Sequence, residues 1–418
     1  MSEWKTVAVR EVADVFDGPH ATPAKTDVGP WYLSISSLSN GRFDFSQSAH
    51  LSDADLPRWT KRVAPLRGDI LFSYETRLGE AAYWEHDVRA ALGRRMGLLR
   101  PKEGKVEPRY LSYAYLGPQF QEVIRQKTLH GATVNRIPVG EMPSWPILLP
   151  SIQTQRAVLD VLDNIDRLID NNRQRMRTLE EIAKAIFGEW FVHFRYPGHA
   201  SVPLVDSLLG PIPEGWEAMV ASTALTVGPR IKLDGDATHP FMAMGDLDVR
   251  SMVCYPSETR NGNTGTKYQN GDTLFARITP SLENGKTGYV QSLAGNEIGL
   301  GSTEFIVLRG SKVGSVFTYC LARTEEFRNH AIASMVGASG RQRVRNECFE
   351  SFLLAVPRVD VADAFEALTQ PMFQEVDALY RESARLVAVR DLLLPKLVTG
   401  QIDVSGLELD AVLVEPAR

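Results

Sequence analysis

The chain has 418 residues, of which 44% are hydrophobic and 23% charged, and a formal net charge of −5 at pH 7. This composition is typical of a globular protein with room for two or more cores, and no stretch is apolar enough to indicate a membrane span. Residues 1–5 lack the charged and then apolar pattern of a secretory signal, so we expect a cytoplasmic protein.

The first predicted globular region mixes strands and helices. Residues 69–74 have strand character, and residues 110–116 and 120–126 have helical character. A Gly131-Ala132-Thr133 turn follows, and a proline-anchored hydrophobic run over residues 145–150 then leads into a long amphipathic segment. We therefore expect a mixed α/β domain that ends at about residue 150.

A long helix is predicted from about Gln155 to Trp190. Its seam residues recur at alternating spacings of four and three, which is the heptad pattern of a helix that pairs with another helix. At 1.5 Å per residue the helix would be on the order of 50 Å long. Asn172 is the polar residue in this seam, where such a residue commonly fixes the register of pairing. The seam consists of Val158, Leu162, Ile165, Ile169, Asn172, Met176, Leu179, Ala183, Ile186 and Trp190.

The second half of the chain repeats the first half in the same order. The numbering offset between matched residues varies from 203 to 209, which indicates insertions in loops and not a tandem solenoid. We therefore predict two copies of one globular unit. The second copy contains strand-like residues 273–278, 288–291 and 303–309, helical residues 316–323 and 325–332, a Gly337-Ala338-Ser339 turn and an anchoring run over residues 352–357.

A second long helix follows the second globular region. Pro371 lies within it, and we expect this proline to kink or restart the helix because it lacks a backbone donor. The two long helices are expected to pair antiparallel, although two independent helices that each pack on their own domain are the alternative. The apolar stripe consists of Phe365, Leu368, Met372, Val376, Leu379, Ser383, Leu386, Val389 and Leu393.

The charges are unevenly distributed. Residues 58–100 contain nine Lys or Arg against five Asp or Glu, and residues 309–345 contain seven against two. Residues 360–391 contain three Lys or Arg against seven Asp or Glu. Each copy thus has a basic region that could contact phosphates, although solvated surface charge is the ordinary explanation for any single arginine.

The sequence predicts no catalytic residues, no metal site and no cofactor. Residues 284–287 mimic the end of a phosphate-binding loop, but Pro280 replaces the required glycine, and a strand is expected where a helix should begin. Cys254, Cys320 and Cys348 have no spacing that indicates a disulfide or a zinc site.

Several segments together resemble the specificity subunit of Type I restriction-modification enzymes. Gly131-Ala132-Thr133, Ile137, the run 147–150 and Gln155 with its heptad helix resemble the end of a target-recognition domain in that family. Residues 358–361 contain no Gln that corresponds to Gln155, which follows Pro150 in the first copy. The second long helix is therefore expected to begin differently. The other similar segments are residues 68–72, 185–194, 209–217 and 390–402.

The resemblance implies an α+β fold with two mixed α/β target-recognition domains joined by two long antiparallel coiled-coil helices in a pseudo-twofold arrangement. It also implies a non-catalytic subunit that binds double-stranded DNA, two methyltransferase subunits and, through the complex, nuclease-translocase subunits. The expected segments are target-recognition domain 1 (1–150), a central conserved helix (151–196), a linker with target-recognition domain 2 (197–357), a C-terminal conserved helix (358–402) and a tail (403–418).

Each domain is then expected to recognise one half of a bipartite DNA site. The matched loops before the two anchoring runs are candidates for backbone contacts, although Gly131 and Gly337 could simply turn the chain there. The coiled-coil interface is expected to use Leu162, Ile165, Ile169, Asn172, Met176, Leu179, Ile186, Val376, Leu379, Leu386 and Leu393. The candidate DNA-binding residues are Arg58, Lys61, Arg62, Arg77, Arg94, Arg95, Thr133, Asn135, Arg136, Lys267, Arg277, Lys286, Ser339, Arg341, Gln342, Arg343 and Arg345.

Two other functional classes remain as alternatives. A coiled-coil interaction scaffold that bridges two proteins would need no DNA contacts. A self-sufficient nuclease would need divalent-metal ligands, and the sequence shows no pair of histidines at metal-binding spacing.

Overall fold

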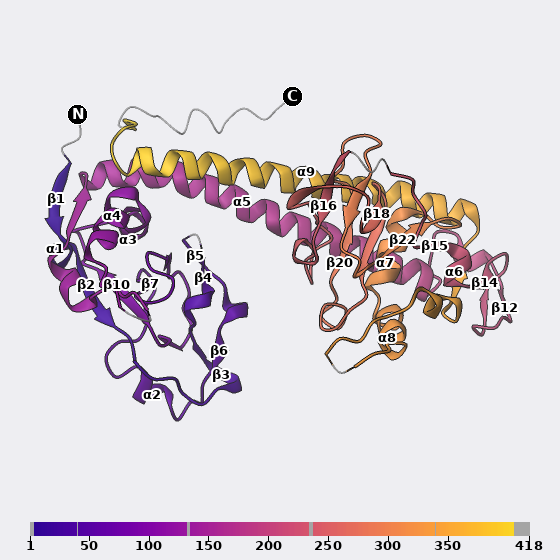
Figure 1. Cartoon of the computed structure of the whole chain (residues 1–418), viewed down its shortest axis with the longest axis horizontal. Coiled ribbons are helices and arrows are strands. Elements are labelled where there is room, and N and C mark those ends of the chain that lie inside the picture. The colour runs from indigo at the N-terminus through magenta and orange to yellow at the C-terminus, as the bar shows by residue number, and fades with distance from the viewer. Residues whose placement is uncertain (1–3, 40, 132–133, 234–236, 339, 405–418) are drawn as a thin grey trace. The chain divides into compact units, whose positions relative to one another are not determined.

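The computed structural model describes residues 4–39, 41–131, 134–233, 237–338 and 340–404. The chain divides into two compact units (Figure 1), of which unit 1 contains Met1–Leu168 with Leu386–Arg418 and unit 2 contains Ile169–Arg385. The division passes through both long helices, α5 (Ile152–Phe187) and α9 (Val359–Leu397). Each unit therefore combines a globular part with one portion of each helix.

Unit 1 is built on a four-stranded antiparallel sheet of order β2-β10-β7-β8. A second sheet has the order β6-β3-β9, and β1 pairs with β11 just before α5. The bounds are β1 (Lys5–Ala8), α1 (Val9–Val12), β2 (Ala13–Asp17), β3 (Thr26–Tyr32), β4 (Leu38–Ser39), β5 (Arg42–Phe43), β6 (Ala49–His50), α2 (Leu56–Trp59), β7 (Ile70–Ser73), β8 (Ala81–Tyr83), β9 (Ala90–Ala91), β10 (Met96–Pro101), α3 (Pro108–Leu116), α4 (Pro118–Lys127) and β11 (Pro146–Leu149).

Unit 2 repeats this topology. Its central sheet has the order β15-β22-β19-β20, its second sheet has the order β17-β16-β21-β18, and β14 pairs with β23 just before α9. The bounds are β12 (Leu204–Val205), β13 (Ile212–Pro213), β14 (Glu217–Val220), α6 (Ala221–Ala224), β15 (Leu225–Val227), β16 (Thr238–Met242), β17 (Glu258–Asn261), β18 (Thr266–Tyr268), β19 (Thr273–Ala276), β20 (Thr287–Tyr289), β21 (Gly299–Gly301), β22 (Phe305–Gly310), α7 (Ser315–Arg323), α8 (Glu325–Ala333) and β23 (Leu353–Val356).

The predicted strands and helices within the globular regions are confirmed to within a few residues. The strand expected at 69–74 is β7, and the one expected at 273–278 is β19. The helices expected at 110–116 and 316–323 are α3 and α7, and each is followed directly by a second helix. These segments were predictable because strand alternation, helix periodicity and their Gly and Pro boundaries agree with one another.

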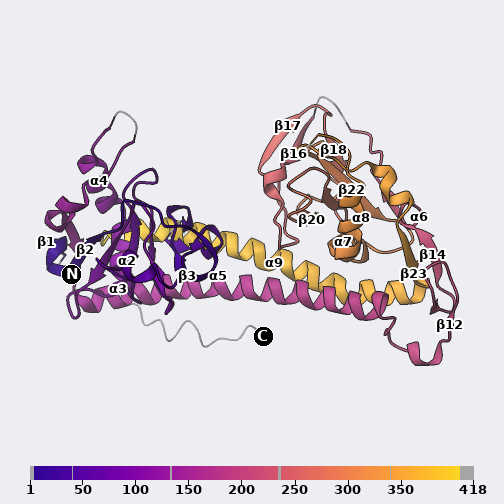
Figure 2. The same cartoon turned by 90° about the horizontal axis from the view of Figure 1, so that it is seen from below.

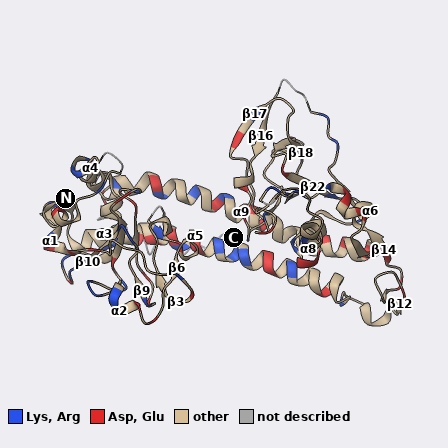
Figure 3. Cartoon of the chain, turned by 60° about the horizontal axis from the view of Figure 1, so that its bottom comes forward, with Lys and Arg blue, Asp and Glu red and all other residues tan. Residues whose placement is uncertain are grey.

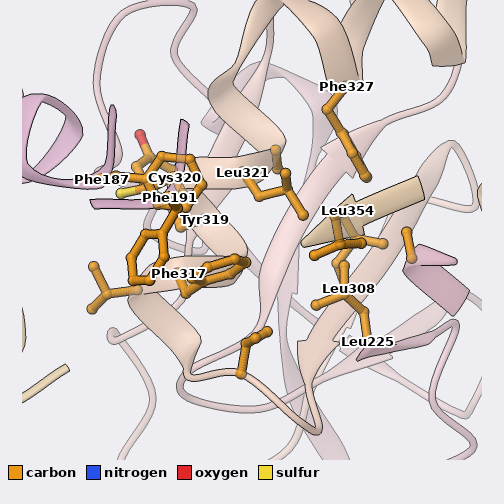
Figure 4. Close-up of a cluster of buried hydrophobic side chains, with 14 of the residues drawn as sticks. Phe187, Phe191, Leu225, Leu308, Phe317, Tyr319, Cys320, Leu321, Phe327 and Leu354 are labelled. Atoms are coloured by element: carbon orange, nitrogen blue, oxygen red, sulfur yellow. The ribbon is translucent and has the colours of Figure 1, made fainter. Parts of the chain in front are cut away.

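In both units the globular core packs against the long helices. In unit 2, Phe187 of α5 contacts Phe317 of α7 and Phe365 of α9 edge-on, with ring centroids 5.0 and 6.1 Å apart. Figure 4 shows this cluster, which extends to Leu308 and Leu354 on the strands. In unit 1, Val158 and Leu162 of α5 belong to the same buried cluster as the α3 and α4 residues. Burial of these side chains fixes each helix portion to its globular part.

Within each unit α5 and α9 run in opposite directions. In unit 1, Arg390 of α9 donates to Asp166 of α5 at 3.1 Å. In unit 2, Asn172 donates to Glu382 at 2.9 Å and Arg175 donates to Glu375 at 2.7 Å. The partner numbers fall as the α5 numbers rise, which defines an antiparallel pair, and Figure 2 shows the two helices side by side.

The restart that Pro371 was expected to cause is wrong. Helix α9 is continuous from Val359 to Leu397, and Pro371 is exposed. Phe365 and Phe373, on either side of the proline, are buried. Their tertiary packing holds the helix through a position that has no backbone donor.

The predicted apolar stripe of α9 is wrong at two positions. Leu368 and Val389 are each 45% exposed. Thr369 and Arg390, one residue further along, are buried instead. The buried face of α9 thus includes polar side chains that hydrogen-bond locally or across the pair, which an apolar periodicity cannot detect.

A buried Asp–Arg pair lies at the same place in each central sheet. Asp69 precedes β7 and accepts two hydrogen bonds from Arg100 of β10, from Nε at 2.9 Å and from Nη2 at 2.7 Å. Asp272 precedes β19 and accepts the same pair from Arg309 of β22, at 2.6 and 2.8 Å. Each carboxylate also accepts a backbone N–H from three residues upstream. Arg100 and Arg309, which belong to the basic stretches of the sequence, are therefore structural.

The long helices also cap a corresponding helix in each unit, α3 and α7, by different residues. In unit 1, Gln155 of α5 accepts the N–H of Glu107, immediately before α3, at 2.9 Å and donates to the carbonyl of Pro150 at 3.0 Å. In unit 2, Glu366 of α9 accepts the N–H groups of Val316 and Phe317 at the start of α7, at 3.3 and 2.9 Å. The second helix lacks the glutamine, and a carboxylate farther along α9 replaces its capping bond.

We predict that Asp69→Ala and Asp272→Ala each lower the free energy of unfolding by about 2 kcal/mol or more, because each leaves an arginine without its bidentate partner. Urea unfolding of the full chain measures the change. The control is Asp53→Ala, which removes an ion pair to Arg89 whose side chains are 66% and 68% exposed, and which should change stability by less than about 1 kcal/mol. Equal effects of Asp272→Ala and Asp53→Ala would contradict the structural role.

We predict a pH-dependent effect for Glu366. Burial raises the pKa of this carboxyl, although the backbone N–H groups at α7 oppose the shift. Its contribution to stability is then greatest below the unfolded pKa of about 4.3 and decreases as the pH rises through the folded pKa. Glu366→Gln should therefore compare better with the wild type at pH 7 than at pH 4. Glu366→Ala should also lose less at pH 7 than at pH 4, and it should be less stable than Glu366→Gln by about 1 kcal/mol at both. Unfolding curves at the two pH values test this, and a Gln variant that is relatively weaker at pH 7 would refute it.

Candidate nucleic-acid interface

Polar loops lie at one end of the strands in each central sheet. In an antiparallel sheet the end of one strand lies beside the start of its neighbour. In unit 1 the ends of β2 and β7 and the start of β10 therefore meet at one edge, and in unit 2 the ends of β15 and β19 and the start of β22 do so. We call this the loop edge. The buried Asp–Arg pair lies at the other edge of each sheet.

A matched loop closes over each loop edge. In unit 1, Leu129 and Arg136 exchange two backbone hydrogen bonds of 2.9 and 3.0 Å, and the N–H of Ile137 donates to the carbonyl of Tyr74 just after β7. In unit 2, Val336 and Arg343 exchange the same pair, and the N–H of Val344 donates to the carbonyl of Arg277 just after β19. The two loops, 129–136 and 336–343, have the same length and attachment.

Glycine has a structural role in both loops. Gly337 has a φ of +132°, which side chains rarely adopt. A Cβ on Gly131 would lie 2.6 Å from the carbonyl oxygen of Val134. The alternative that these glycines turn the chain is therefore supported, and it is compatible with contacts made by the neighbouring arginines.

The loop edge of unit 1 borders an open pocket of about 400 Å³. Gly18 and Pro19, which follow β2, form one wall, and Arg58, Lys61 and Arg62 line the other. Asp17 lies on the pocket rim, 3.8 Å from the Arg62 guanidinium.

His20 also lines this pocket, and it lies 3.0 Å from Asp17 and 3.4 Å from the Tyr74 hydroxyl. Burial raises the pKa of Tyr74, and the neighbouring Asp17 carboxylate raises it further. Tyr74 therefore remains a neutral hydroxyl at physiological pH. The exposed positive charge of this pocket comes from its arginines and lysine.

The loop edge of unit 2 borders a matched pocket of about 310 Å³. Gly228 and Pro229, which follow β15, occupy the place of Gly18 and Pro19, at an offset of 210. Arg230, Lys267 and Arg277 supply its positive charge, and none of the residues lining it is acidic. Two pockets thus occupy corresponding places in the two copies with different side chains.

Several predicted DNA-binding residues are exposed at the loop edges, their pockets or their closing loops. Thr133 and Ser339 lie outside the described residues, and Gln342 is half-buried in the second loop. The exposed residues are Arg58, Lys61, Arg62, Arg94, Asn135, Arg136, Arg341, Arg343 and Arg345.

Other predicted residues lie at the same edge but make internal contacts. Arg77 donates to the carbonyls of Ile35 and Ser36 at 3.4 and 3.3 Å. Arg95 pairs with Glu75 at 2.7 Å. Lys286 donates to the carbonyl of Met244 at 2.8 Å. Such contacts hold the loops in place and restrict the orientation of these side chains.

Arg343 is exposed, yet it also has an internal partner. It pairs with Glu304 at 2.6 Å, and this hydrogen-bonded carboxylate raises the pKa of Arg343. Among the arginines of the second loop region, Arg341 and Arg345 therefore offer the simpler phosphate contacts.

The backbone is strained at the loop edge of unit 1. Thr76 and Arg95 have φ values of +66° and +71°, which are uncommon for residues with side chains. They are held together by a hydrogen bond from Arg95 Nη1 to Thr76 Oγ1 at 3.3 Å and by one from the Tyr74 N–H to the Arg95 carbonyl at 3.0 Å. Strain of this kind is concentrated at functional sites in proteins.

Three residues of these pockets were not predicted from the sequence. His20 and Arg230 follow the two Gly-Pro pairs, and Asn346 lies beside Gly228. The repeat of Gly-Pro at a constant offset was the available signal for the first two. Asn346 gave no signal, because the matched position in the first copy is Val139.

The predicted interface residues of α5 are buried or half-buried within their units. Leu162, Ile169 and Asn172 are each at most 3% exposed. Met176, Leu179 and Ile186 pack on the unit 2 core as well as facing α9. On α9, Val376 and Leu379 are buried, and Leu386 and Leu393 are half-buried. Figure 3 shows both signs of charge along the two helices.

The described part of the chain contains no group of three or more His, Cys, Asp or Glu residues that could hold a metal ion. Within the same residues, no helix has the length and apolar character needed to cross a membrane.

Comparison with known proteins finds similarity to one family. Residues 1–181 match the family model of the Type I restriction modification DNA specificity domain. The MjaIX Type I restriction enzyme specificity subunit of Methanocaldococcus jannaschii is 23% identical over 426 residues, an alignment that covers 97% of this chain and 95% of that protein. The HindI specificity subunit of Haemophilus influenzae is 21% identical over 469 residues, with coverage of 96% and 100%.

A solved structure shares the fold. The S subunit of a Type I restriction-modification system from M. genitalium aligns with a TM-score of 0.54 and 13% sequence identity, and the alignment covers 95% of this chain and 96% of that one.

Proposed function

The chain belongs to the specificity-subunit family of Type I restriction-modification enzymes, and we propose that its two loop edges each recognise one half of a bipartite DNA site. The single observation that best supports this proposal is the repetition of the edge. The same strand ends, the same closed loop and a basic pocket after a Gly-Pro pair recur in both units. A repeated polar surface on a repeated scaffold suits a ligand with two separate contact regions, such as a duplex.

The proposal assigns different roles to exposed and fixed side chains. Flexible, exposed cations such as Arg58, Lys61 and Arg341 would bind phosphates, which position the protein without sequence information. Side chains held by internal bonds at the same edge would contact base edges in the major groove. Thr133 and Ser339 belong to the two closing loops and are proposed as backbone contacts.

The long helices are proposed as the spacer between the two recognition domains. Antiparallel contacts within each unit, such as Asn172 with Glu382 and Asp166 with Arg390, support a paired coiled coil. A spacer of fixed length would require the two half-sites to lie about one helical turn apart, or a multiple of it. The same helices are proposed to bind two methyltransferase subunits, to which the nuclease-translocase subunits add, and the chain itself is proposed to be non-catalytic.

The proposal is tested with the full chain assembled with its methyltransferase subunits. Methylome sequencing of the host with and without this gene should reveal a bipartite motif that disappears on deletion. A gel-shift assay should then show retention of DNA containing that motif over DNA with either half scrambled. If no methylated motif disappears on deletion and no DNA is retained at low salt, the result would favour the interaction scaffold without a DNA role.

We predict that Arg136→Ala and Arg341→Ala each reduce the slope of log affinity against log salt by about 1, because each removes one phosphate contact. The controls are Lys102→Ala and Lys312→Ala, which remove a partly buried and an exposed cation beyond the other ends of β10 and β22. Binding of one DNA is measured over a series of salt concentrations. An unchanged slope for Arg341→Ala would remove that residue from the phosphate contacts.

A further inference from the structure

The pocket of unit 2 differs from its counterpart in a way that bears on specificity. Resting on the proposed function, we infer that Arg277 and Asn346 form a base-recognition pair, which contacts the edge of one base pair and not a phosphate. Both residues line the pocket beside Gly228 and Pro229.

Arg277 is fixed in place before any ligand binds. It follows β19, its backbone N–H donates to the carbonyl of Glu304 at 3.0 Å, and its Nη2 donates to the carbonyl of Val344. The guanidinium therefore has a set orientation. Its Nε atom is buried and makes no hydrogen bond with any residue in the described part of the chain.

Asn346 packs against Gly228 in the same pocket. Its Nδ2 atom lies 2.9 Å from the position that a Cβ on Gly228 would occupy, so the amide packs directly on the glycine. Its Oδ1 atom is also buried, and among the described residues it has no hydrogen-bond partner. Two residues that line one pocket thus carry an unsatisfied donor and an unsatisfied acceptor, and buried polar atoms in proteins are rarely left in this state.

A donor beside an acceptor matches a base edge better than a phosphate. A phosphate diester offers only acceptor oxygens, which the Asn346 carbonyl oxygen would repel. The major-groove edge of adenine offers the N7 acceptor with the N6 donor, and a guanine–cytosine pair offers the O6 acceptor with the N4 donor. The Arg277 donor and the Asn346 acceptor complement either edge.

The matched pocket of unit 1 lacks this pair. Tyr74 occupies the place of Arg277, because each accepts the N–H that closes its loop. Val139 occupies the place of Asn346, because each begins the short helical turn after that loop. Unit 1 instead presents the exposed Lys61 and its neighbouring arginines, which suit phosphates. The base-recognition pair is therefore a property of the second half-site alone.

The test uses the full chain with its methyltransferase subunits and DNA in which each base pair of the wild-type motif is changed in turn. Asn346→Ala should reduce discrimination at one base pair of one half-site by about tenfold, with the other half-site and the salt slope unchanged. Arg277→Lys retains the positive charge but lacks Nε, and it should lose discrimination within the same half-site. Lys61→Ala is the matched control, which should weaken binding of all sequences alike.

The outcomes separate the two proposals. Unchanged discrimination in Asn346→Ala, or a uniform loss of affinity for every sequence, would overturn the base-recognition pair while the wild-type motif still stands. Absence of any motif for the wild-type complex would instead overturn the proposed function. Because Arg277 also donates to a backbone carbonyl, the unfolding midpoint of each variant is measured. If Arg277→Lys does not fold, the proposal is judged on the Asn346→Ala result alone.

Discussion

The antiparallel order of the central sheet is the constraint on which the rest of the structure depends. Because neighbouring strands run in opposite directions, β2, β7 and β10 bring two strand ends and one strand start to a single edge, and β15, β19 and β22 do the same. The other edge contains the Asp69–Arg100 or Asp272–Arg309 pair. One end of each sheet is thus closed by a buried ion pair, and the other is left to loops and surface cations. This separation lets stability and ligand contact be provided by different residues.

The features that the sequence predicted well are those set by local patterns. The predictions from local patterns are the heptad spacing from Val158 onward, the anchoring runs 145–150 and 352–357, and the strands at 69–74 and 273–278. Each depends on residues close together in the chain. Their repetition in the second half made the duplication of the globular unit predictable as well. The continuous α9 was not predictable, because the packing of Phe365 and Phe373 outweighs the local effect of Pro371.

The site was harder to predict, because its residues meet only through the sheet register. Counting charges placed Arg100, Arg309 and Arg323 with the basic residues, yet Asp69 and Asp272 bind the first two, and Arg323 is buried with three backbone carbonyls around it. The distribution of charge along a sequence does not reveal which cations form ion pairs or hydrogen bonds inside the folded protein. Asn346 was missed for a different reason. It is uncharged and has no counterpart in the first copy, so neither charge nor repetition indicated a role in binding.

The closing loops 129–136 and 336–343 show how such a protein can change without refolding. The hydrogen bonds that close them join main-chain groups, Leu129 with Arg136 and Val336 with Arg343. Exposed side chains such as those of Arg136 and Arg341 can therefore vary while this hydrogen-bonded frame persists. Substitutions in these loops can therefore change the chemistry of the surface with little effect on the stability of the core. This property is expected of a protein whose targets diversify during evolution.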